Sequence, residues 1–115
     1  MPPKIEVRAL PRFQRDVKHL SKKYRHLRKD LDSFVERLSQ GETPGDQITR
    51  SAYTVYKARV TNSDAQRGKQ GGYRVIYYVK MPTRLLLVTI YAKTEQSDID
   101  PDEIRRIIEE GDMGE

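Results

Sequence analysis

Two consecutive segments with strong β-sheet preference, at residues 73–80 and 85–92, constrain the fold of this chain more than any other feature. Side chains in the first segment alternate with the period of two that is typical of a β-strand. The second segment is apolar at nearly every position, which predicts a central strand covered on both faces. Residues 81–84, Met-Pro-Thr-Arg, predict a tight turn between them, so we expect two neighbouring antiparallel strands.

A basic, glycine-rich segment at residues 67–72 leads directly into the first of these strands. Its glycines give the backbone freedom and let another chain approach closely, and it carries Arg67 and Lys69. We expect Arg74 near the start of the rigid strand, beside this cationic loop, in an arrangement that suits binding of a polyanion. A hairpin strand with solvent-exposed Arg74 and Lys80 is the alternative interpretation.

The N-terminal half predicts one strand and two helices. Residues 4–9 alternate as a short strand, and Pro11 suits the first turn of a helix. The amphipathic stripe that predicts this helix consists of Phe13, Val17, Leu20, Tyr24 and Leu27. A second helical pattern covers residues 31–38, with Gly41 placed to end it as a left-handed cap. No strong breaker lies near His26, so the sequence leaves open whether the two helices are separate or joined.

The C-terminal half completes an α+β pattern. Residues 41–50 predict a loop, and residues 53–60 alternate as a strand with Lys57 and Arg59 on one face. Residues 100–103, Asp-Pro-Asp-Glu, predict a helix N-terminus in which the first aspartate caps, the proline takes the first helical position and the glutamate completes a capping box. The predicted order is β-α-α-β-β-β-α, an antiparallel meander with helices packed against it.

Length and charge limit the functional classes. A chain of 115 residues predicts a single domain over residues 1–115. Residues 1–94 carry 20 Lys and Arg against 8 Asp and Glu, whereas residues 95–115 carry 2 against 9. Such a cationic body attracts nucleic acid, an anionic membrane or an acidic protein, with simple solubility as the alternative. Cysteine is absent, no apolar signal segment begins the chain, and the longest apolar run covers residues 85–88, so we expect a cytoplasmic protein without membrane contact.

Most catalytic chemistries lack the residues that they need. His19 and His26 have no carboxylate cluster near them in the sequence, which argues against a metal site. No cysteine is present, no serine has a candidate histidine base nearby in the sequence, and the glycine-rich segment lacks the spacing of a Walker loop. We therefore expect neither a metal nor another cofactor.

The remaining candidates are cations on or near the ends of predicted strands: Lys57, Arg59, Arg74 and Lys93. Such a cluster can cleave RNA without a metal, because the ribose 2′-hydroxyl attacks its own phosphate. Arginines bind the phosphate and stabilise its growing charge, while a lysine takes or gives a proton. The same cluster could instead bind phosphate or an acidic peptide without any chemistry.

Segments along nearly the whole chain resemble the RelE superfamily of bacterial toxins, in its HigB-like branch, most clearly at residues 55–60, 68–79 and 87–99. The joint occurrence of Gly-Gly-Tyr-Arg at 71–74 and Tyr-Ala-Lys-Thr-Glu at 91–95 is more specific than either segment alone. The resemblance implies a RelE/ParE-like α+β fold. In that fold two N-terminal helices pack on a twisted, mostly antiparallel four-stranded sheet, and a C-terminal helix follows.

The resemblance also implies a function. Members of this superfamily are toxins of type II toxin–antitoxin modules, and the expected activity is that of an mRNA interferase, an endoribonuclease that cuts messenger RNA in the ribosomal A site. The expected partners are the ribosome, mRNA and a cognate antitoxin that neutralises the toxin. Operator DNA would be bound only through the antitoxin complex.

The expected catalytic set follows by position from the resemblance. Lys57 and Arg59 resemble the basic strand pair of RelE enzymes, Arg74 resembles their phosphate-binding arginine, and Lys93 falls where a basic residue near the active site is usual.

The chain departs from RelE at two positions. RelE has a further arginine where this chain has Thr94, and a stacking tyrosine where it has Asp100. Tyr91 or Tyr73 could stack an RNA base instead, with packing inside the sheet as the alternative for both. The expected RNA-binding residues are Arg67, Lys69, Tyr73 and Tyr91.

Other functions remain open at this point. The missing arginine and tyrosine favour a non-catalytic toxin of the RelE/ParE fold that poisons a protein target, or an inactive toxin that only binds its antitoxin. A small nucleic-acid-binding regulator that uses the basic helix at residues 12–29 is a further alternative.

Overall fold

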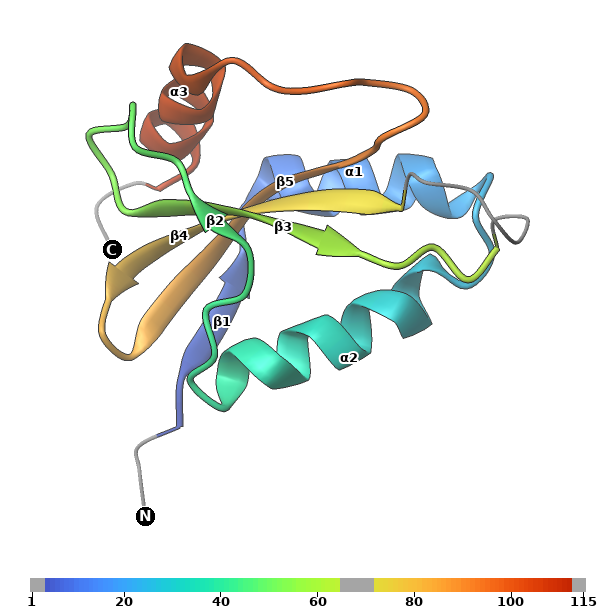
Figure 1. Ribbon diagram of the computed structural model, residues 1–115, viewed down its shortest axis with the longest axis horizontal. Coiled ribbons are helices and arrows are strands. Elements are labelled where there is room, and N and C mark those ends of the chain that lie inside the picture. Colours follow the sequence, from blue (N-terminus) through green and yellow to red (C-terminus); the bar gives the residue numbers. More distant parts are fainter. Residues whose placement is uncertain (1–3, 65–71, 113–115) are drawn as a thin grey trace.

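A five-stranded sheet forms the centre of the computed structural model, which describes residues 4–64 and 72–112 (Figure 1). The strands are β1 (Glu6–Ala9), β2 (Asp46–Gln47), β3 (Val55–Val60), β4 (Tyr73–Met81) and β5 (Arg84–Ala92), in the spatial order β1-β5-β4-β3-β2. The helices are α1 (Pro11–Ser21), α2 (Leu27–Ser39) and α3 (Pro101–Gly111). β1 pairs parallel with β5, and the other pairs are antiparallel. The predicted α+β class and the mostly antiparallel sheet are confirmed.

The predicted number of strands was one too low. Residues 46–47, inside the segment predicted as a loop, form β2 and pair with Lys57 and Tyr56 at the sheet edge. Both residues of β2 are exposed. A two-residue strand is too short to show any alternation, so hydrophobic periodicity carries no signal for it.

The all-apolar segment is a central strand, as predicted. β5 lies between β1 and β4, and every residue from Leu85 to Ala92 is buried. Side chains on one face of the sheet join α1 and α2 in a core that includes Val75 and Tyr77. Side chains on the other face join α3 in a second core that includes Ile76 and Val88. The sheet is therefore covered from both sides, which explains why alternation is lost in β5.

The two N-terminal helices are separate. α1 ends at Ser21, and α2 begins at Leu27 after a short turn. Asp64, from the segment after β3, accepts a hydrogen bond of 2.7 Å from the backbone N–H of His26 and lies 2.6 Å from its Nδ1. This partner lies far away in the sequence, which is why no local breaker marks the turn. Gly41 has φ +97°, as expected for the predicted left-handed cap.

The helix start at α3 is confirmed, but the capping box is not. Asp100 accepts a hydrogen bond of 2.8 Å from the backbone N–H of Asp102, and Pro101 is the first helical residue. The carboxylate of Glu103 lies 3.8 Å from the Arg12 guanidinium of α1. The predicted box was therefore wrong about Glu103, because this side chain contacts a neighbouring helix rather than the cap.

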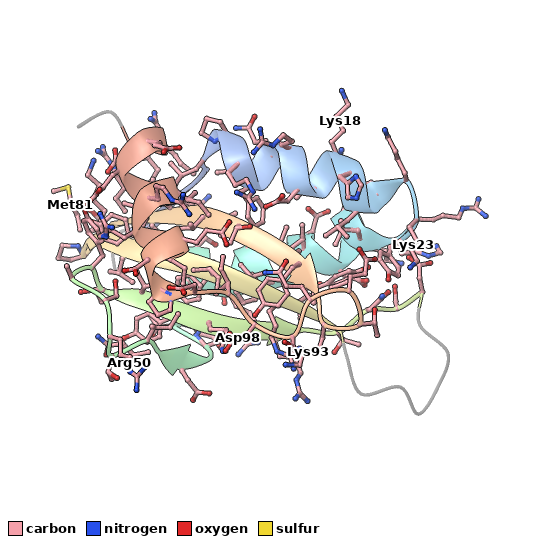
Figure 2. The ribbon with its side chains drawn as sticks, turned by 90° about the horizontal axis from the view of Figure 1, so that it is seen from above. Lys18, Lys23, Arg50, Met81, Lys93 and Asp98 are labelled. Carbon is pink, nitrogen blue, oxygen red and sulfur yellow. The ribbon has the colours of Figure 1, made fainter. Side chains whose placement is uncertain are left out.

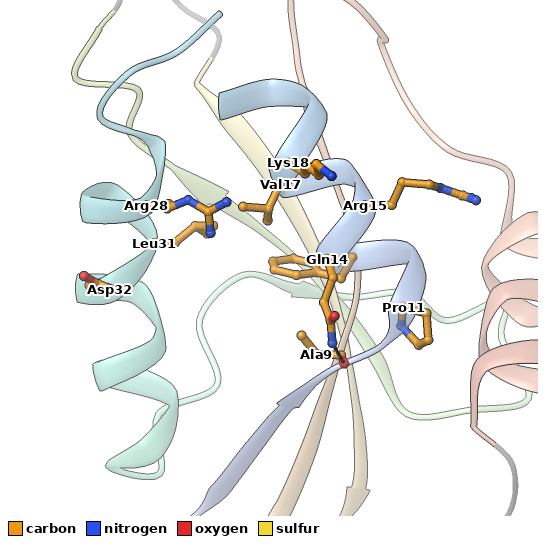
Figure 3. A pocket seen from close by; sticks show the side chains of 10 residues that line it. Ala9, Pro11, Gln14, Arg15, Val17, Lys18, Arg28, Leu31 and Asp32 are labelled. Atoms are coloured by element: carbon orange, nitrogen blue, oxygen red, sulfur yellow. Dashed lines mark hydrogen bonds between the residues drawn. The ribbon is translucent and has the colours of Figure 1, made fainter. Parts of the chain in front are cut away.

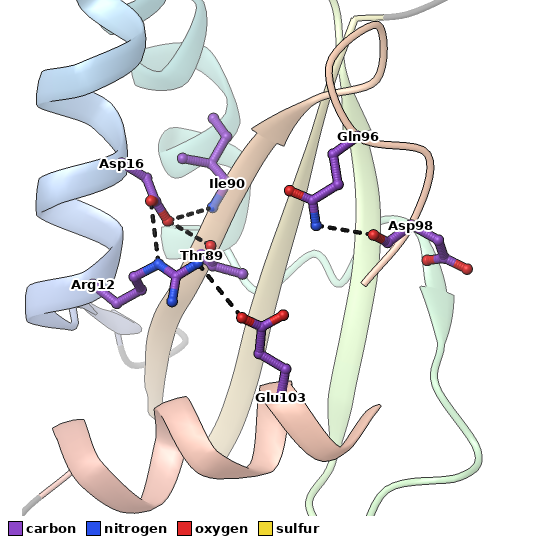
Figure 4. Close-up of polar contacts among 7 residues, drawn as sticks. All are labelled: Arg12, Asp16, Thr89, Ile90, Gln96, Asp98 and Glu103. Carbon is purple, nitrogen blue, oxygen red and sulfur yellow. Dashed lines mark hydrogen bonds and ion pairs between the residues drawn. The ribbon is translucent and has the colours of Figure 1, made fainter. Parts of the chain in front are cut away.

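A polar network fixes α1 against β5 (Figure 4). The buried Thr89 hydroxyl donates a hydrogen bond of 2.5 Å to Asp16, and Arg12 Nε lies 3.2 Å from the same carboxylate. Buried polar groups are normally paired in this way, and unpaired ones would destabilise the fold. Within residues 4–64 and 72–112, each helix falls short of the length and apolar character that crossing a bilayer requires.

Candidate functional site

The predicted cations of β3 and β4 lie on the same face of the sheet. Arg59 is paired with Arg74, and Lys57 is paired with Ile76. Directly paired residues of antiparallel strands project to the same face, and Ile76 belongs to the core beneath α3. By register, Lys57, Arg59 and Arg74 therefore start from the α3 side of the sheet. Arg59, near the end of β3, also lines a pocket beside α2 together with Asp30 and Phe34. Arg74 is the second residue of β4, as predicted.

Helix α3 covers only one end of this face. Near its C-terminus, Tyr53 donates a hydrogen bond of 3.0 Å to Glu109, and Lys80 Nζ lies 2.9 Å from Asp112. Both contacts lie toward the start of β3 and the end of β4. Arg59 and Arg74 lie at the opposite end of these antiparallel strands, so the helix leaves the cationic end uncovered. Arg59 is exposed, and Arg74 is half-buried.

Lys93 reaches the same end of the sheet from β5. Its backbone N–H donates a hydrogen bond of 3.0 Å to the carbonyl of Gly72, at the start of β4. Gly72 has φ +68°, and a Cβ at this position would lie 2.6 Å from the Val60 carbonyl oxygen. Glycine therefore allows the end of β3, the start of β4 and the end of β5 to meet. We call Lys57, Arg59, Arg74 and Lys93 the cation cluster.

The connection between β5 and α3 crosses beside the cation cluster and adds a carboxylate to it. Lys57 Nζ donates a hydrogen bond of 2.9 Å to Asp98 Oδ1, and Lys93 Nζ donates one of 2.5 Å to the Ser97 carbonyl. Figure 2 shows Lys93 and Asp98 on the same side of the molecule. The hydrogen bond from Lys57 is the largest cause that holds the pKa of Asp98 below its ordinary value of 3.8.

Asp98 was missed by the sequence-based prediction. It stands within the segment at 87–99 that carries the family resemblance, five residues after Lys93. An acidic residue that closely follows a cation expected in the site was the available signal. The signal is weak, because many acidic residues follow in the remaining part of the chain.

Tyr91 also lies at the cation cluster. It is paired with Arg74 and is 6% exposed, on the face that α3 covers. Burial raises the pKa of its hydroxyl, while the nearby Arg74 guanidinium acts in the opposite direction. Among the described residues, this buried hydroxyl has no hydrogen-bond partner. Unpaired buried polar groups of this kind are rare. Because the hydroxyl oxygen is also closed off from solvent, a ligand does not reach it in this arrangement.

Tyr73 lies on the opposite face. It is fully buried in the core with α1 and α2, and its ring meets the Tyr24 ring edge to face, with centroids 5.5 Å apart. Burial raises the pKa of Tyr73 far above its ordinary value. Its position matches the alternative interpretation, packing within the sheet, and the structure does not bring it together with the cations.

The other positions singled out in the sequence are Arg67, Lys69, Thr94 and Asp100. Arg67 and Lys69 lie outside the described residues. Thr94 is exposed, and Asp100 serves as the cap of α3. Among residues 4–64 and 72–112, no group of three or more His, Asp or Glu side chains is arranged to hold a metal ion.

A separate groove lies between α1 and α2, on the other side of the sheet (Figure 3). It has a volume of about 920 Å³ and includes the apolar residues Val17 and Leu31. Lys18 and Arg28 also line it, so these two cations lie on the side of the sheet away from the cation cluster. Lys23, from the same basic region, instead pairs with Glu95 of the connection between β5 and α3.

The register of β3 and β4 places two arginines of the cation cluster on neighbouring strands. Arg59 and Arg74 occupy paired positions on neighbouring strands, which lie about 4.8 Å apart in β-sheets generally. Guanidinium groups on two such strands can contact one phosphate together. Lys57 and Lys93 add ammonium groups that can donate protons, and Asp98 adds a possible acceptor.

Comparison with known proteins identifies the family. Residues 13–112 match the family model described as the RelE toxin of the RelE/RelB toxin-antitoxin system. Neither the curated proteins nor the solved structures contain a match to this chain. The assignment to a HigB-like branch stays a prediction. The matched range includes all three helices except the first two residues of α1, and the strands from β2 to β5. The chain thus belongs to the RelE toxin family, which implies a cognate antitoxin as its partner.

Proposed function

We propose that this toxin is a ribosome-dependent endoribonuclease that cleaves messenger RNA in the ribosomal A site. The chain belongs to the RelE family, and one structural observation supports the proposal. Arg59 and Arg74 are paired on one face of the sheet, with Lys57 on the same face and Lys93 at its edge. This end of the face is not covered by α3.

In the proposed reaction the RNA supplies its own nucleophile. The ribose 2′-oxygen attacks the adjacent phosphorus, and the bond from phosphorus to the 5′-oxygen breaks. Arg59 and Arg74 hold the phosphate and stabilise the charge that builds on its oxygens. A lysine ammonium of the cation cluster protonates the leaving 5′-oxygen. The products are a 2′,3′-cyclic phosphate and a 5′-hydroxyl, and the role of the protein is to provide position and charge.

In this proposal the ribosome positions the RNA, because the protein lacks the stacking tyrosine of RelE. The position of the stacking tyrosine of RelE is occupied by Asp100, which is engaged as the cap of α3. Tyr91 is almost fully buried, so its ring offers little surface for stacking. Positioning of the message within the A site would replace a stacking platform on the toxin. The cognate antitoxin would neutralise the toxin, and operator DNA would be bound through the complex of the two proteins.

Controlled expression tests this proposal. Expression without the antitoxin should arrest growth and generate new 5′ ends within codons of translated messages, mapped by sequencing of 5′-hydroxyl ends. Arg74→Ala should abolish both effects while the far-ultraviolet circular dichroism spectrum stays unchanged. Lys18→Ala is the matched control, because it removes one charge from exposed helix α1 near the groove on the other face. Full toxicity of a folded Arg74→Ala variant would remove Arg74 from the mechanism.

The non-catalytic alternative has a distinct outcome. It is favoured by Thr94 and Asp100, which replace the arginine and tyrosine of RelE. Growth arrest with intact messages would indicate a toxin that poisons a protein target. Absence of toxicity together with tight antitoxin binding would indicate an inactive toxin.

A further inference from the structure

The contact between Lys57 and Asp98 is unusual among the ion pairs of the described residues, because it places a carboxylate inside the cation cluster. The side chain of Asp98 is 65% exposed and that of Lys57 is 33% exposed. Ion pairs as exposed as this contribute little to folding stability. Asp98 lies beside Lys57 and Lys93 of the proposed site, and a contribution to stability does not explain that position.

The Asp98 carboxylate has one engaged and one available oxygen. Oδ1 accepts a hydrogen bond of 2.9 Å from Lys57 Nζ and one of 2.8 Å from the backbone N–H of Ile99. Among the described residues, Oδ2 has no hydrogen-bond partner. The carboxylate is therefore oriented by two donors, while its second oxygen is open to a ligand.

The backbone around Asp98 is anchored on both sides. Before it, Lys93 Nζ binds the Ser97 carbonyl, and the Gln96 amide donates a hydrogen bond of 2.9 Å to the carbonyl of Asp98 (Figure 4). After it, Ile99 is buried in the core with α3. Such anchoring fits a group that must be held in position for chemistry, since catalysis depends on orientation.

We propose that Asp98 is the general base of the RNA cleavage reaction, with Oδ2 accepting the proton of the ribose 2′-hydroxyl. This inference rests on the proposed ribonuclease function. The O–H bond of the 2′-hydroxyl breaks as its proton moves to Asp98, and the 2′-oxygen forms its bond to phosphorus. The bond between phosphorus and the 5′-oxygen then breaks, and the 5′-oxygen takes a proton from a lysine ammonium of the cluster.

The contact with Lys57 also explains how the site returns to its starting state. After one turnover Asp98 is protonated and one lysine has lost a proton. A proton moves from the carboxylic acid to the neutral amine, directly when that lysine is Lys57, because the two groups are hydrogen-bonded at 2.9 Å. The charged groups that face Asp98 are Lys57 from β3 and Lys93 from the loop, with the Tyr91 hydroxyl of β5 nearby. Both cations favour the ionised form of Asp98, so the carboxylate is the form present at neutral pH.

Cleavage of message on programmed ribosomes by purified full-length variants tests the assignment. Asp98→Asn keeps the shape of the side chain and an acceptor oxygen for Lys57 but cannot act as a base. The single-turnover cleavage rate at saturating toxin should fall by about 10²-fold or more, with ribosome binding unchanged or tighter. Asp98→Glu should recover part of the rate, because it restores a carboxylate.

Asp46→Asn is the matched control. Asp46 is an exposed residue of β2, paired with Lys57, and this variant makes the same change of charge close to the cluster. A rate for Asp46→Asn within about twofold of wild type would show that charge alone does not explain the loss in Asp98→Asn. A cleavage rate of Asp98→Asn equal to or above that of wild type would overturn the inference, and would indicate that Asp98 only competes with RNA for Lys57. If wild-type protein cleaves no message on ribosomes, the proposed function itself fails.

Discussion

The two faces of β3, β4 and β5 differ in composition. One is apolar core along its length, and the other carries cations at one end. On the face toward α1 and α2, Ala58, Tyr73 and Tyr77 are at most 1% exposed and belong to the core. On the other face, beyond the end of α3, the paired residues are arginines, of which Arg59 is exposed and Arg74 is half-buried. Residues adjacent in the sequence thus lie in different surroundings. Under the proposed function, stability and activity should therefore respond to different substitutions.

The largest effect on stability is expected at Tyr77. Its ring is fully buried between the Phe34 and Tyr56 rings, and its hydroxyl donates a hydrogen bond of 2.5 Å to the Pro44 carbonyl. Tyr77→Ala should lower the free energy of unfolding by about 3–5 kcal/mol, the range found for large aromatic residues in cores. Urea denaturation followed by circular dichroism measures this. A loss below about 1 kcal/mol would contradict the rigid-face interpretation.

Arg59 should show the reverse behaviour. It is exposed and forms no ion pair within the described residues. Arg59→Ala should reduce the rate of message cleavage by about 10²–10³-fold, equivalent to about 2.7–4 kcal/mol of transition-state stabilisation. The urea midpoint should stay at the wild-type value. If the variant loses stability but keeps its activity, the proposed division between the two faces is wrong at this position.

Gly72 lies where the ends of β3 and β5 meet the start of β4, so its substitution should change both the stability and the cleavage rate. The backbone there has φ +68°, which strains any residue with a side chain, and an added Cβ would lie 2.6 Å from the Val60 carbonyl oxygen. Gly72→Ala should lower the free energy of unfolding by about 1–3 kcal/mol and also reduce the rate of cleavage, because Lys93 is held by the Gly72 carbonyl. Gly41→Ala is the control, since Gly41 also has a positive φ but nothing lies within 4 Å of an added Cβ. Equal losses in both variants would show that backbone strain, rather than the close approach, is responsible.

The smallest effect is expected from Asp64, which supports the helical face. Backbone and side-chain hydrogen bonds from His26 hold the pKa of Asp64 below its ordinary value of 3.8. A carboxyl group with a lowered folded-state pKa stabilises the fold above its unfolded pKa, and this contribution is lost as the pH falls through the folded pKa. Asp64→Asn should therefore lower the melting temperature at pH 7 but not well below pH 3.8. A difference from wild type that is the same at both pH values would contradict this linkage.

Much of the fold was predictable because its signals are local. The alternation in β3 and β4 and the apolar run of β5 predicted the strands, and the Asp-Pro pair predicted the start of α3. β2 was missed because two residues cannot show a period. The turn between α1 and α2 was left open because it depends on Asp64, which lies 38 residues after His26.

The candidate site divides in the same way. Residue type and strand position selected Lys57, Arg59, Arg74 and Lys93 as candidates, and alternation placed the first two on one face. The resemblance to RelE then assigned an expected role to each of the four positions. Alternation also separates Tyr73 from Arg74, but only the packing of the helices decides which of the two faces becomes core. Tyr73 therefore lies against Tyr24, on the side away from the cations.

The amino-acid sequence by itself determined the class of the fold, the family and the set of cations, because propensity, periodicity and motif spacing act over a few neighbouring residues. Only the tertiary structure decided which groups meet. Lys57 and Asp98 are 41 residues apart, and their contact exists because the connection from β5 to α3 is drawn across the sheet by the burial of Ile99. A contact of that kind depends on the path of the whole chain, and no local pattern encodes it.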